Sequence, residues 1–322
     1  MKSINVMRIT MIINIIRKLF LFTLLVSSAV QAQGWPRTFL NADGSTTTLN
    51  APAKRILSTS VSITGTLLAV DAPVIASATT TNGDYFAQWR AVAEQRGVER
   101  LWPAGSVDLE MAYAFEPDLI IVSLGGADSA LGQLNELRQI APTVVLDYGG
   151  QNWQQLAEEI GEVVGIEQQV ATKIAQFDDY IAQTRAALTL PKGQANIISY
   201  NGPGVTNPIA TPHGSHGMLL KSLGFDIEGP NPAWQTGPSR LNDFVRAHYE
   251  HLTELTAPTT FLFNATDAKV PQFLNDPVLA NLPSVKTGQV YGLGANSFRI
   301  DYFSAHEIVD GIRARFGAPV TP

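Results

Sequence analysis

The chain has 322 residues and contains no cysteine. This absence excludes structural disulfides, lipid attachment through an amino-terminal cysteine and metal sites built from thiolates. Stability must therefore come from the burial of apolar surface. A chain of this length can bury enough of that surface for two lobes of ordinary domain size without covalent cross-links.

Long uncharged apolar runs are scarce, and one stands near the amino terminus. Residues 19–30 follow the basic pair Arg17-Lys18 and end in the small-residue pattern Val30-Gln31-Ala32. This arrangement is typical of a secretory signal peptide cleaved before Gln33. The run is shorter than the roughly 20 apolar residues that cross a bilayer. We therefore expect residues 1–32 to be a signal peptide and the mature protein to lie in the periplasm.

Positive charge is in short supply once that segment is set aside. Lys2, Arg8, Arg17 and Lys18 belong to it, and removing these four from 22 Lys and Arg leaves 18 against 28 Asp and Glu, a net charge of −10. Such a balance argues against nucleic acid or an anionic membrane as the main partner. A cleft in which a few arginines converge could still bind an anionic ligand.

Strand-like and helix-like segments alternate along the chain. In the first half, apolar runs at 55–60, 74–78, 119–122 and 143–146 are separated by helix-compatible segments at 64–70 and 129–140. Continuous apolar strands between helices indicate a parallel sheet that is covered on both faces. After Pro191 the alternation restarts with a strand at 195–200, followed by a loop rich in Gly, Pro and Asn and a helix at 218–223. Strands at 261–263 and 290–293 and a final helix at 304–316 come later.

A long amphipathic segment connects the two series. Residues 167–190 lie between Gly165 and Pro191, and their apolar side chains recur at helical spacing at Val170, Ile174, Phe177, Ile181 and Leu188. Such a helix would be about 33 Å long, enough to run from one lobe to another. We therefore expect an α/β fold of two Rossmann-like lobes, residues 33–165 and 191–322, joined by a single helix at 166–190, with a ligand-binding cleft between them.

Two glutamates occupy matching positions in the two halves. Glu110 begins a short helix that leads through Pro117 into the strand at 119–122. Glu250 leads in the same way through Pro258 into the strand at 261–263. A single glutamate at a helix start usually serves only the helix dipole. The matched pair is better evidence of two related lobes.

These segments resemble the substrate-binding proteins of iron-siderophore, haem and cobalamin ABC importers. The resemblance is carried by 55–76 (RILSTSVSITGTLLAVDAPVIA), Gln88-Trp89, Glu110 with 117–120, 250–252, 276–279 and 289–304 (QVYGLGANSFRIDYFS). It implies a monomeric binding protein, without enzymatic activity or an intrinsic cofactor, that delivers its ligand to an inner-membrane permease. It also implies that Glu110 and Glu250 dock onto arginines of that permease.

The likeness is greatest to members that take ferric catecholates such as ferric enterobactin. That ligand is anionic and aromatic, so it needs guanidinium forks and aromatic faces. Candidate ligand-binding residues are Arg299, Arg240, Trp234, Tyr85 and Tyr302. Arg299 could instead form a salt bridge with the neighbouring Asp301, and Trp234 could instead cover the domain surface.

One departure from the resembled proteins reduces the positive charge of the first lobe. Those proteins have arginines in the loop before the Gln-Trp pair, whereas this chain has Ala87 before Gln88-Trp89. A less charged ligand is therefore an alternative, and haem, cobalamin and hydroxamate siderophores remain open.

The segment His213-Gly214-Ser215-His216-Gly217 suggests two further readings. His213 and His216 could coordinate iron directly, with Tyr200 or Tyr302 as a partner. Exposed loop histidines usually bind nothing, so we expect no protein metal site. The segment also resembles the nucleophile elbow of a periplasmic α/β hydrolase, but it lacks the first glycine of Gly-x-Ser-x-Gly. We therefore expect a binding protein rather than an enzyme.

Overall fold

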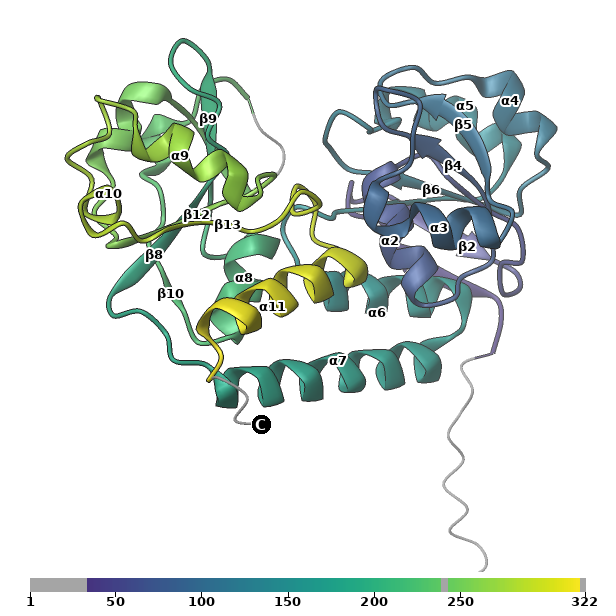
Figure 1. The fold of residues 1–322 in the computed structure, drawn as a ribbon. Coiled ribbons are helices and arrows are strands. Elements are labelled where there is room, and N and C mark those ends of the chain that lie inside the picture. Colours follow the sequence, from purple (N-terminus) through teal and green to yellow (C-terminus); the bar gives the residue numbers. More distant parts are fainter. Residues whose placement is uncertain (1–33, 239–242, 319–322) are drawn as a thin grey trace, which may run out of the picture.

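Two α/β lobes stand side by side above a long helix that runs beneath both, as the computed structural model in Figure 1 shows. The structure describes residues 34–238 and 243–318, so the expected signal peptide lies outside the described residues. The predicted fold class, two lobes joined by a long helix, is confirmed. Within the described ranges, no helix combines the length and the apolarity that crossing a membrane would require.

The first lobe is built on a five-stranded sheet in the order β5-β4-β3-β6-β7, and all of its pairings are parallel, as the apolar strands predicted. A two-stranded antiparallel hairpin precedes it. The elements are β1 (Arg37–Leu40), β2 (Thr46–Leu49), β3 (Ile56–Ser58), α2 (Val61–Ala69), β4 (Val74–Thr79), α3 (Ala87–Gln95), β5 (Glu99–Pro103), α4 (Leu109–Ala114), β6 (Leu119–Ser123), η1 (Leu131–Gln133), α5 (Leu134–Ile140) and β7 (Thr143–Leu146).

Two helices lead out of this lobe. The first, α6 (Trp153–Val164), ends at Gly165, whose backbone has the left-handed conformation that favours glycine. The second, α7 (Glu167–Ala187), is the predicted connecting helix, and it ends three residues before the predicted end. Val170, Phe177 and Ile181 are buried along one face of α7, as their spacing predicted. That face packs against α6 and α11.

The second lobe has a mixed sheet in the order β11-β9-β8-β12-β13, with β10 beside β8. Its elements are β8 (Gln194–Ile198), β9 (Thr206–Ala210), α8 (Ser215–Ser222), β10 (Asp226–Ile227), η2 (Pro232–Trp234), β11 (Phe244–His248), η3 (Tyr249–Glu254), β12 (Thr259–Leu262), η4 (Asp267–Lys269), α9 (Val270–Leu274), α10 (Pro283–Thr287), β13 (Val290–Gly292) and α11 (Tyr302–Phe316).

The sheet of this lobe is mixed, unlike the parallel sheet that was predicted for the first lobe. Strand β9 runs antiparallel to both β8 and β11, and it lies in the stretch that the composition predicted to be a loop. Asn207 and Pro208 interrupt its apolar pattern, which hid the strand. Helix α8 also begins earlier than predicted, at Ser215 rather than residue 218.

The two lobes share one hydrophobic core beneath the space between them. This central cluster includes Leu67 of the first lobe, Trp153 and Phe177 of the helices below, and Phe261 and Ile308 from the later part of the chain. Two smaller clusters cover the outer faces of the two sheets. Each fully buried large apolar side chain contributes about 1.5–3 kcal/mol to folding. The shared core therefore ties the lobes together and restricts their relative motion.

Candidate functional site

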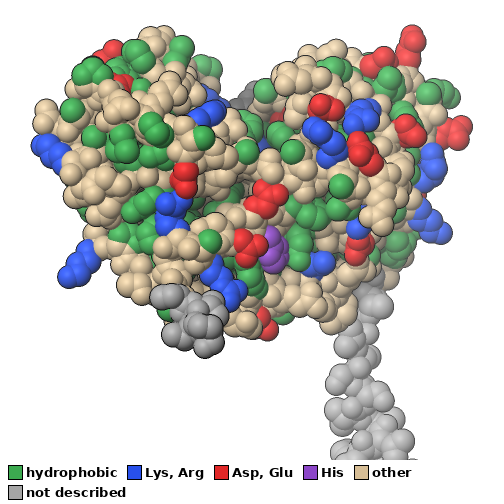
Figure 2. Space-filling view, in the orientation of Figure 1, with side chains coloured by type: hydrophobic (Ala, Val, Ile, Leu, Met, Phe, Trp, Pro, Cys, Tyr) green, Lys and Arg blue, Asp and Glu red, His purple; other side chains and the backbone are tan. Residues whose placement is uncertain are grey.

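A cavity of about 380 Å³ lies between the two lobes. The space-filling view in Figure 2 shows the surface hollowed at this place. The first lobe contributes Thr80, Thr81, Asn82, Phe86, Ala87 and Gln88 to its wall, and the second contributes Asn264, Ala295, Asn296, Phe298 and Arg299. A cavity of this size falls within the range of about 300–1,000 Å³ that is usual for small-molecule sites.

Most wall residues occupy loops that follow strands, and Ala87 and Gln88 lie in the first turn of α3. Thr80 to Asn82 come directly after β4, Asn264 comes shortly after β12, and Tyr148, beside Arg299, comes shortly after β7. In sheets of this type the carboxyl ends of parallel strands form the ligand crevice. The topology therefore brings residues that are far apart in the sequence to one cleft.

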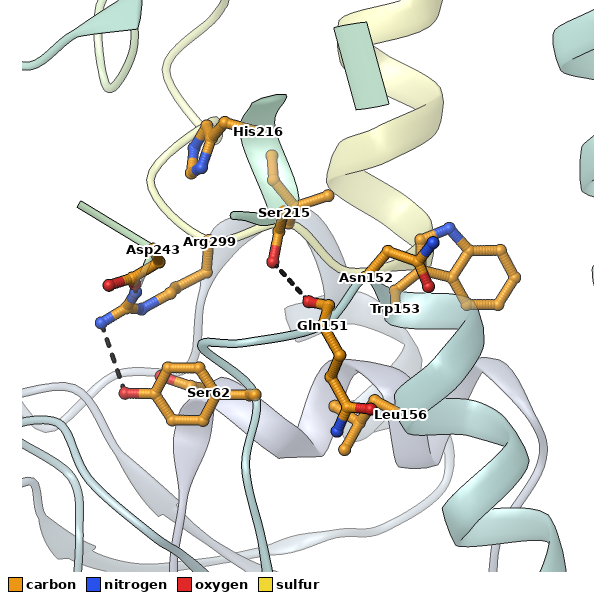
Figure 3. Close-up of a pocket in the computed structure, with 11 residues that line it drawn as sticks. Ser62, Gln151, Asn152, Trp153, Leu156, Ser215, His216, Asp243 and Arg299 are labelled. Carbon is orange, nitrogen blue, oxygen red and sulfur yellow. Dashed lines mark hydrogen bonds and ion pairs between the residues drawn. The ribbon is translucent and has the colours of Figure 1, made fainter. Parts of the chain in front are cut away.

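Arg299 lies between two aromatic rings, one from each side of the cleft. The carbon at the centre of its guanidinium is 4.8 Å from the ring centroid of Tyr148 and 4.8 Å from that of Phe298. Its Nη1 donates to Asp243 Oδ2 at 2.9 Å, and its Nη2 donates to the Tyr148 hydroxyl at 3.3 Å. Figure 3 shows Arg299 and Asp243 side by side. The guanidinium is thus fixed in position by contacts with both lobes.

Tyr148 links Arg299 to the first lobe by hydrogen bonds. Its hydroxyl donates to Asp128 Oδ1 at 3.1 Å, while Asp128 Oδ2 accepts from Ser60 Oγ at 2.6 Å and from the Ser62 backbone at 2.9 Å. Burial raises the pKa of Tyr148, so the ring stays a neutral hydrogen-bond donor. The four side chains Asp243, Arg299, Tyr148 and Asp128 form one polar chain across the base of the cleft.

A second, much smaller cavity of about 10 Å³ lies at that base. Asp243, Arg299 and His216 line it. Burial raises the pKa of Asp243 above its ordinary value, although Arg299 opposes this shift. Burial also lowers the pKa of His216 to about 4, so its imidazole is neutral near pH 7. In Figure 3, Ser215 of α8 donates to the Gln151 carbonyl, at 2.8 Å, a further contact between the two sides.

The salt bridge of Arg299 with Asp301 that the sequence left open is not formed. Arg299 pairs with Asp243 instead. The Asp301 side chain caps α11 by accepting from the backbone N–H groups of Phe303 and Ser304, and it also accepts from Gln88 of the first lobe at 3.1 Å. Burial raises the pKa of Asp301 to about 6. Helix capping therefore directs Asp301 away from its neighbour.

Aromatic faces line the larger cavity from both sides. Phe86 and Phe298 come from opposite walls, and their rings meet edge to face with centroids 6.4 Å apart. Phe298 is 41% exposed, which is unusual for so large an apolar side chain. The pair can offer ring contacts to a planar ligand group.

Three predicted binding residues line neither cavity. Trp234 lies in η2, stacked on His251 with centroids 5.1 Å apart, and packs against the outer core of the second lobe. Tyr85 is buried in the first lobe, where its hydroxyl donates to the Val98 carbonyl at 3.0 Å. Tyr302 begins α11 and packs against Trp153. Arg240 lies outside the described residues.

The two histidines that suggested direct iron coordination have different environments. His213 is exposed, whereas His216 is buried on α8. The His216 Nε2 hydrogen-bonds the Ser297 carbonyl at 2.7 Å. The Tyr200 hydroxyl donates to Asp276. In the part of the chain that the structure describes, no three His, Cys, Asp or Glu side chains come together as a metal site.

Glu110 and Glu250 are both exposed at the beginning of short helices, as their positions predicted. Glu110 lies in the first turn of α4, where Asp108 caps the helix by accepting from the Met111 N–H at 2.9 Å. Glu250 lies in the first turn of η3. The hydroxyl of the adjacent Tyr249 donates to Asp276 at 2.6 Å. Both carboxylates are thus held on rigid local structure.

Sequence reasoning missed several cleft residues, above all Asp243, Tyr148, Phe86 and Phe298. Tyr148 could have been found, because it follows the apolar run 143–146 on the carboxyl side of a strand. Phe298 is adjacent to the predicted Arg299. Asp243 had no such signal, since strand β11, which it precedes, was not predicted.

Comparison with known proteins places this architecture in a family. The family model described as periplasmic binding protein matches residues 56–297. The ferric enterobactin-binding periplasmic protein FepB of Escherichia coli O6:H1 is 38% identical over 301 residues, which is 90% of this chain and 93% of that protein.

Solved structures agree with this assignment. The crystal structure of holo-ViuP is 55% identical, with a TM-score of 0.87 over 89% of this chain and 99% of that chain. The catecholate-siderophore binding protein VctP from Vibrio cholerae is 18% identical and shares the fold, with a TM-score of 0.62 over 87% of this chain and 100% of that chain. The chain therefore belongs to the periplasmic binding protein family, whose members bind substrates for transport.

Proposed function

We propose that this protein is the periplasmic solute-binding component of an ABC importer and captures a ferric catecholate siderophore of the enterobactin kind. The observation that carries the proposal is the inter-lobe cavity, in which Arg299 lies against Tyr148 and Phe298. A guanidinium beside aromatic faces suits a ligand made of catecholate rings around iron. The relative of 38% identity, named for ferric enterobactin, supports the same ligand class.

Recognition assigns different tasks to the cleft residues. Arg299 supplies positive charge, Phe86 and Phe298 supply ring faces, and Gln88 and Asn296 supply amide groups for ligand oxygens. Arg240 stays a proposed second cation. The positions of Trp234, Tyr85 and Tyr302 outside both cavities favour a supporting role for these side chains.

Delivery requires a surface that the membrane permease can bind. We assign this to Glu110 and Glu250, one exposed carboxylate on each lobe. Two separated charges of the same sign fix the orientation of the docked protein as well as its attraction to basic groups. The protein would act as a monomer that carries its ligand without an intrinsic cofactor.

The test is a titration of intrinsic tryptophan fluorescence with ferric enterobactin, a ferric hydroxamate, haem and cobalamin. Quenching by ferric siderophores, with the chelate recovered intact afterwards, would support binding without turnover. Arg299→Ala should weaken ferric enterobactin binding by clearly more than the ~1 kcal/mol of a surface ion pair. If only haem or cobalamin quenched the fluorescence, or if the chelate were degraded, the proposed function would be rejected.

A further inference from the structure

Asp243 forms an ion pair with one edge of the Arg299 guanidinium. Its Oδ2 accepts from Arg299 Nη1 at 2.9 Å, and the rings of Tyr148 and Phe298 lie on the guanidinium. The Arg299 side chain is 14% exposed and that of Asp243 only 4%. The guanidinium therefore already has a charge partner within the protein.

Among the described residues that line the two cavities the formal charges balance, and the buried Asp128, bonded to Tyr148, adds a further carboxylate at the base of the cleft. Arg299 is the only lysine or arginine, and Asp243 the only carboxylate, among the described residues that line the two cavities. His216 adds no charge near pH 7, because burial holds its pKa at about 4. The remaining wall consists of amide, hydroxyl and apolar groups.

A strongly anionic ligand faces a penalty at this pair. If Arg299 turned fully toward the ligand, Asp243 would be left as a buried carboxylate without its partner, and breaking a buried pair in this way is strongly unfavourable. Asp243 Oδ1 has no hydrogen-bond partner among the described residues; Arg299 gives the carboxylate its ion pair and its largest electrostatic support, and Arg246 adds a smaller attraction. If the pair stayed intact, the charge of Asp243 would repel the ligand.

The aromatic contacts do not carry this penalty. Phe86 and Phe298 offer ring faces whose attraction for another ring is independent of the net charge of the ligand. The cleft thus keeps its affinity for aryl groups while its attraction for negative charge is reduced. This difference is the basis of a selection between ferric chelates.

We propose that Asp243 is a specificity-determining residue that holds Arg299 and lowers the affinity of the cleft for strongly anionic ferric chelates, so that aryl-bearing chelates of low net charge are preferred. This inference rests on the proposed function and narrows its ligand class: within the ferric catecholates, it favours chelates of lower net charge than ferric enterobactin. Asp243 acts through Arg299 rather than by contact with the ligand.

The experiment uses the trianionic ferric enterobactin complex as its probe. Its dissociation constant is measured by fluorescence quenching at low and at high NaCl concentration for the wild-type protein, Asp243→Asn and Asp267→Asn. Asp267 is the matched control, since it also pairs with an arginine, Arg315, but lines neither cavity. Asparagine keeps the shape of the side chain and removes its charge.

We expect Asp243→Asn to bind ferric enterobactin about tenfold more tightly at low salt, with a steeper loss of affinity as salt is added. Asp267→Asn should behave like the wild type. An unchanged or weaker affinity of Asp243→Asn would overturn the proposal, because Asp243 would then be neutral or helpful to anion binding.

Two further measurements keep the result decisive. Asp243→Ser removes the same charge if the asparagine variant does not fold. A steep salt dependence in the wild-type protein would also overturn the proposal, because it would reveal an unneutralised cation in the cleft.

If a ferric siderophore binds but removal of the charge at Asp243 changes nothing, only this inference fails. If no ferric siderophore binds to the wild type or to either Asp243 variant, the proposed function fails with it.

Discussion

Gly65 of α2 packs closely against the Asp301 side chain at the start of α11, 236 positions further along the sequence. A β-carbon on Gly65 would lie 2.4 Å from Asp301 Oδ2 and 2.9 Å from Trp89 Cδ1. The two helices can approach this closely because the residue at the crossing has no side chain. The same Asp301 accepts the hydrogen bond of Gln88, so this crossing borders the cleft.

Gly65→Ala should therefore destabilise the protein by about 1–3 kcal/mol, the usual effect of overpacking a dense core. Urea unfolding followed by circular dichroism measures the change. Gly311→Ala in α11 is the control, because no atom lies within 4 Å of the added β-carbon there. That variant should be more stable than the wild type by up to about 1 kcal/mol, through helix propensity. Equal effects of the two substitutions would contradict the close crossing.

His216 should make the protein less stable in acid. Burial lowers its pKa from 6.5 to about 4, so between these values the unfolded chain takes up a proton that the folded protein does not. The folded state consequently loses about 2 kcal/mol between about pH 7 and pH 5 from this group. His216→Gln, which can still donate to the Ser297 carbonyl, should lose less stability over the same interval. Urea unfolding at pH 7 and at pH 5 measures the free energy of unfolding of both proteins. An equal loss in the wild type and in His216→Gln would refute this assignment.

Phe298→Ala should weaken binding of ferric enterobactin by about 1–2 kcal/mol, because it removes a ring that contacts both Arg299 and the cavity. The fluorescence titration measures the change. Tyr113→Ala removes an aromatic ring that is 71% exposed on α4 and lines neither cavity, so it should bind like the wild type. Equal affinities of Phe298→Ala and the wild type would exclude a ring contact at this position.

Glu110→Arg and Glu250→Arg should leave ligand binding unchanged and abolish siderophore-dependent uptake, because reversed charges repel the basic groups proposed on the permease. Growth under iron limitation and transport of ⁵⁵Fe-labelled chelate measure uptake. Glu158→Arg on α6 changes an exposed glutamate away from both proposed docking sites and should transport normally. Normal uptake by the double variant would remove the two glutamates from docking.

The elements that the sequence predicted well were those with a single dominant period. Helix α7 was recognised by its apolar spacing, and strands β3, β4, β6 and β7 by their continuous apolar runs. Strand β5, whose first two residues are exposed, was not predicted. Strand β9 was not predicted because Asn207 and Pro208 are unusual in a strand interior. Pro208 has no N–H to donate, but its carbonyl accepts from the Ser199 N–H at 2.8 Å.

The candidate site was harder to predict because its pairs form over long sequence distances. Arg299 was identified as a cleft residue, yet its partner is 56 positions away rather than the adjacent carboxylate. Trp234 has no apolar neighbours in the sequence, but the fold brings its ring into a stack with His251. Local sequence patterns show which side chains could take part in a site, whereas contacts between distant segments are fixed only by the tertiary fold.

The apolar cluster that continues from one lobe into the other has a thermodynamic consequence for capture of the ligand. Since one core continues beneath both walls of the cleft, a large relative movement of the walls is costly; we therefore expect little free energy to go into reorganisation when a chelate enters, so that more of the contact energy appears as affinity. Such preorganisation favours a scavenger that must retain a scarce nutrient at low concentration. The same rigidity means that, for release at the membrane, the transporter must supply the free energy that separates the walls of the cleft.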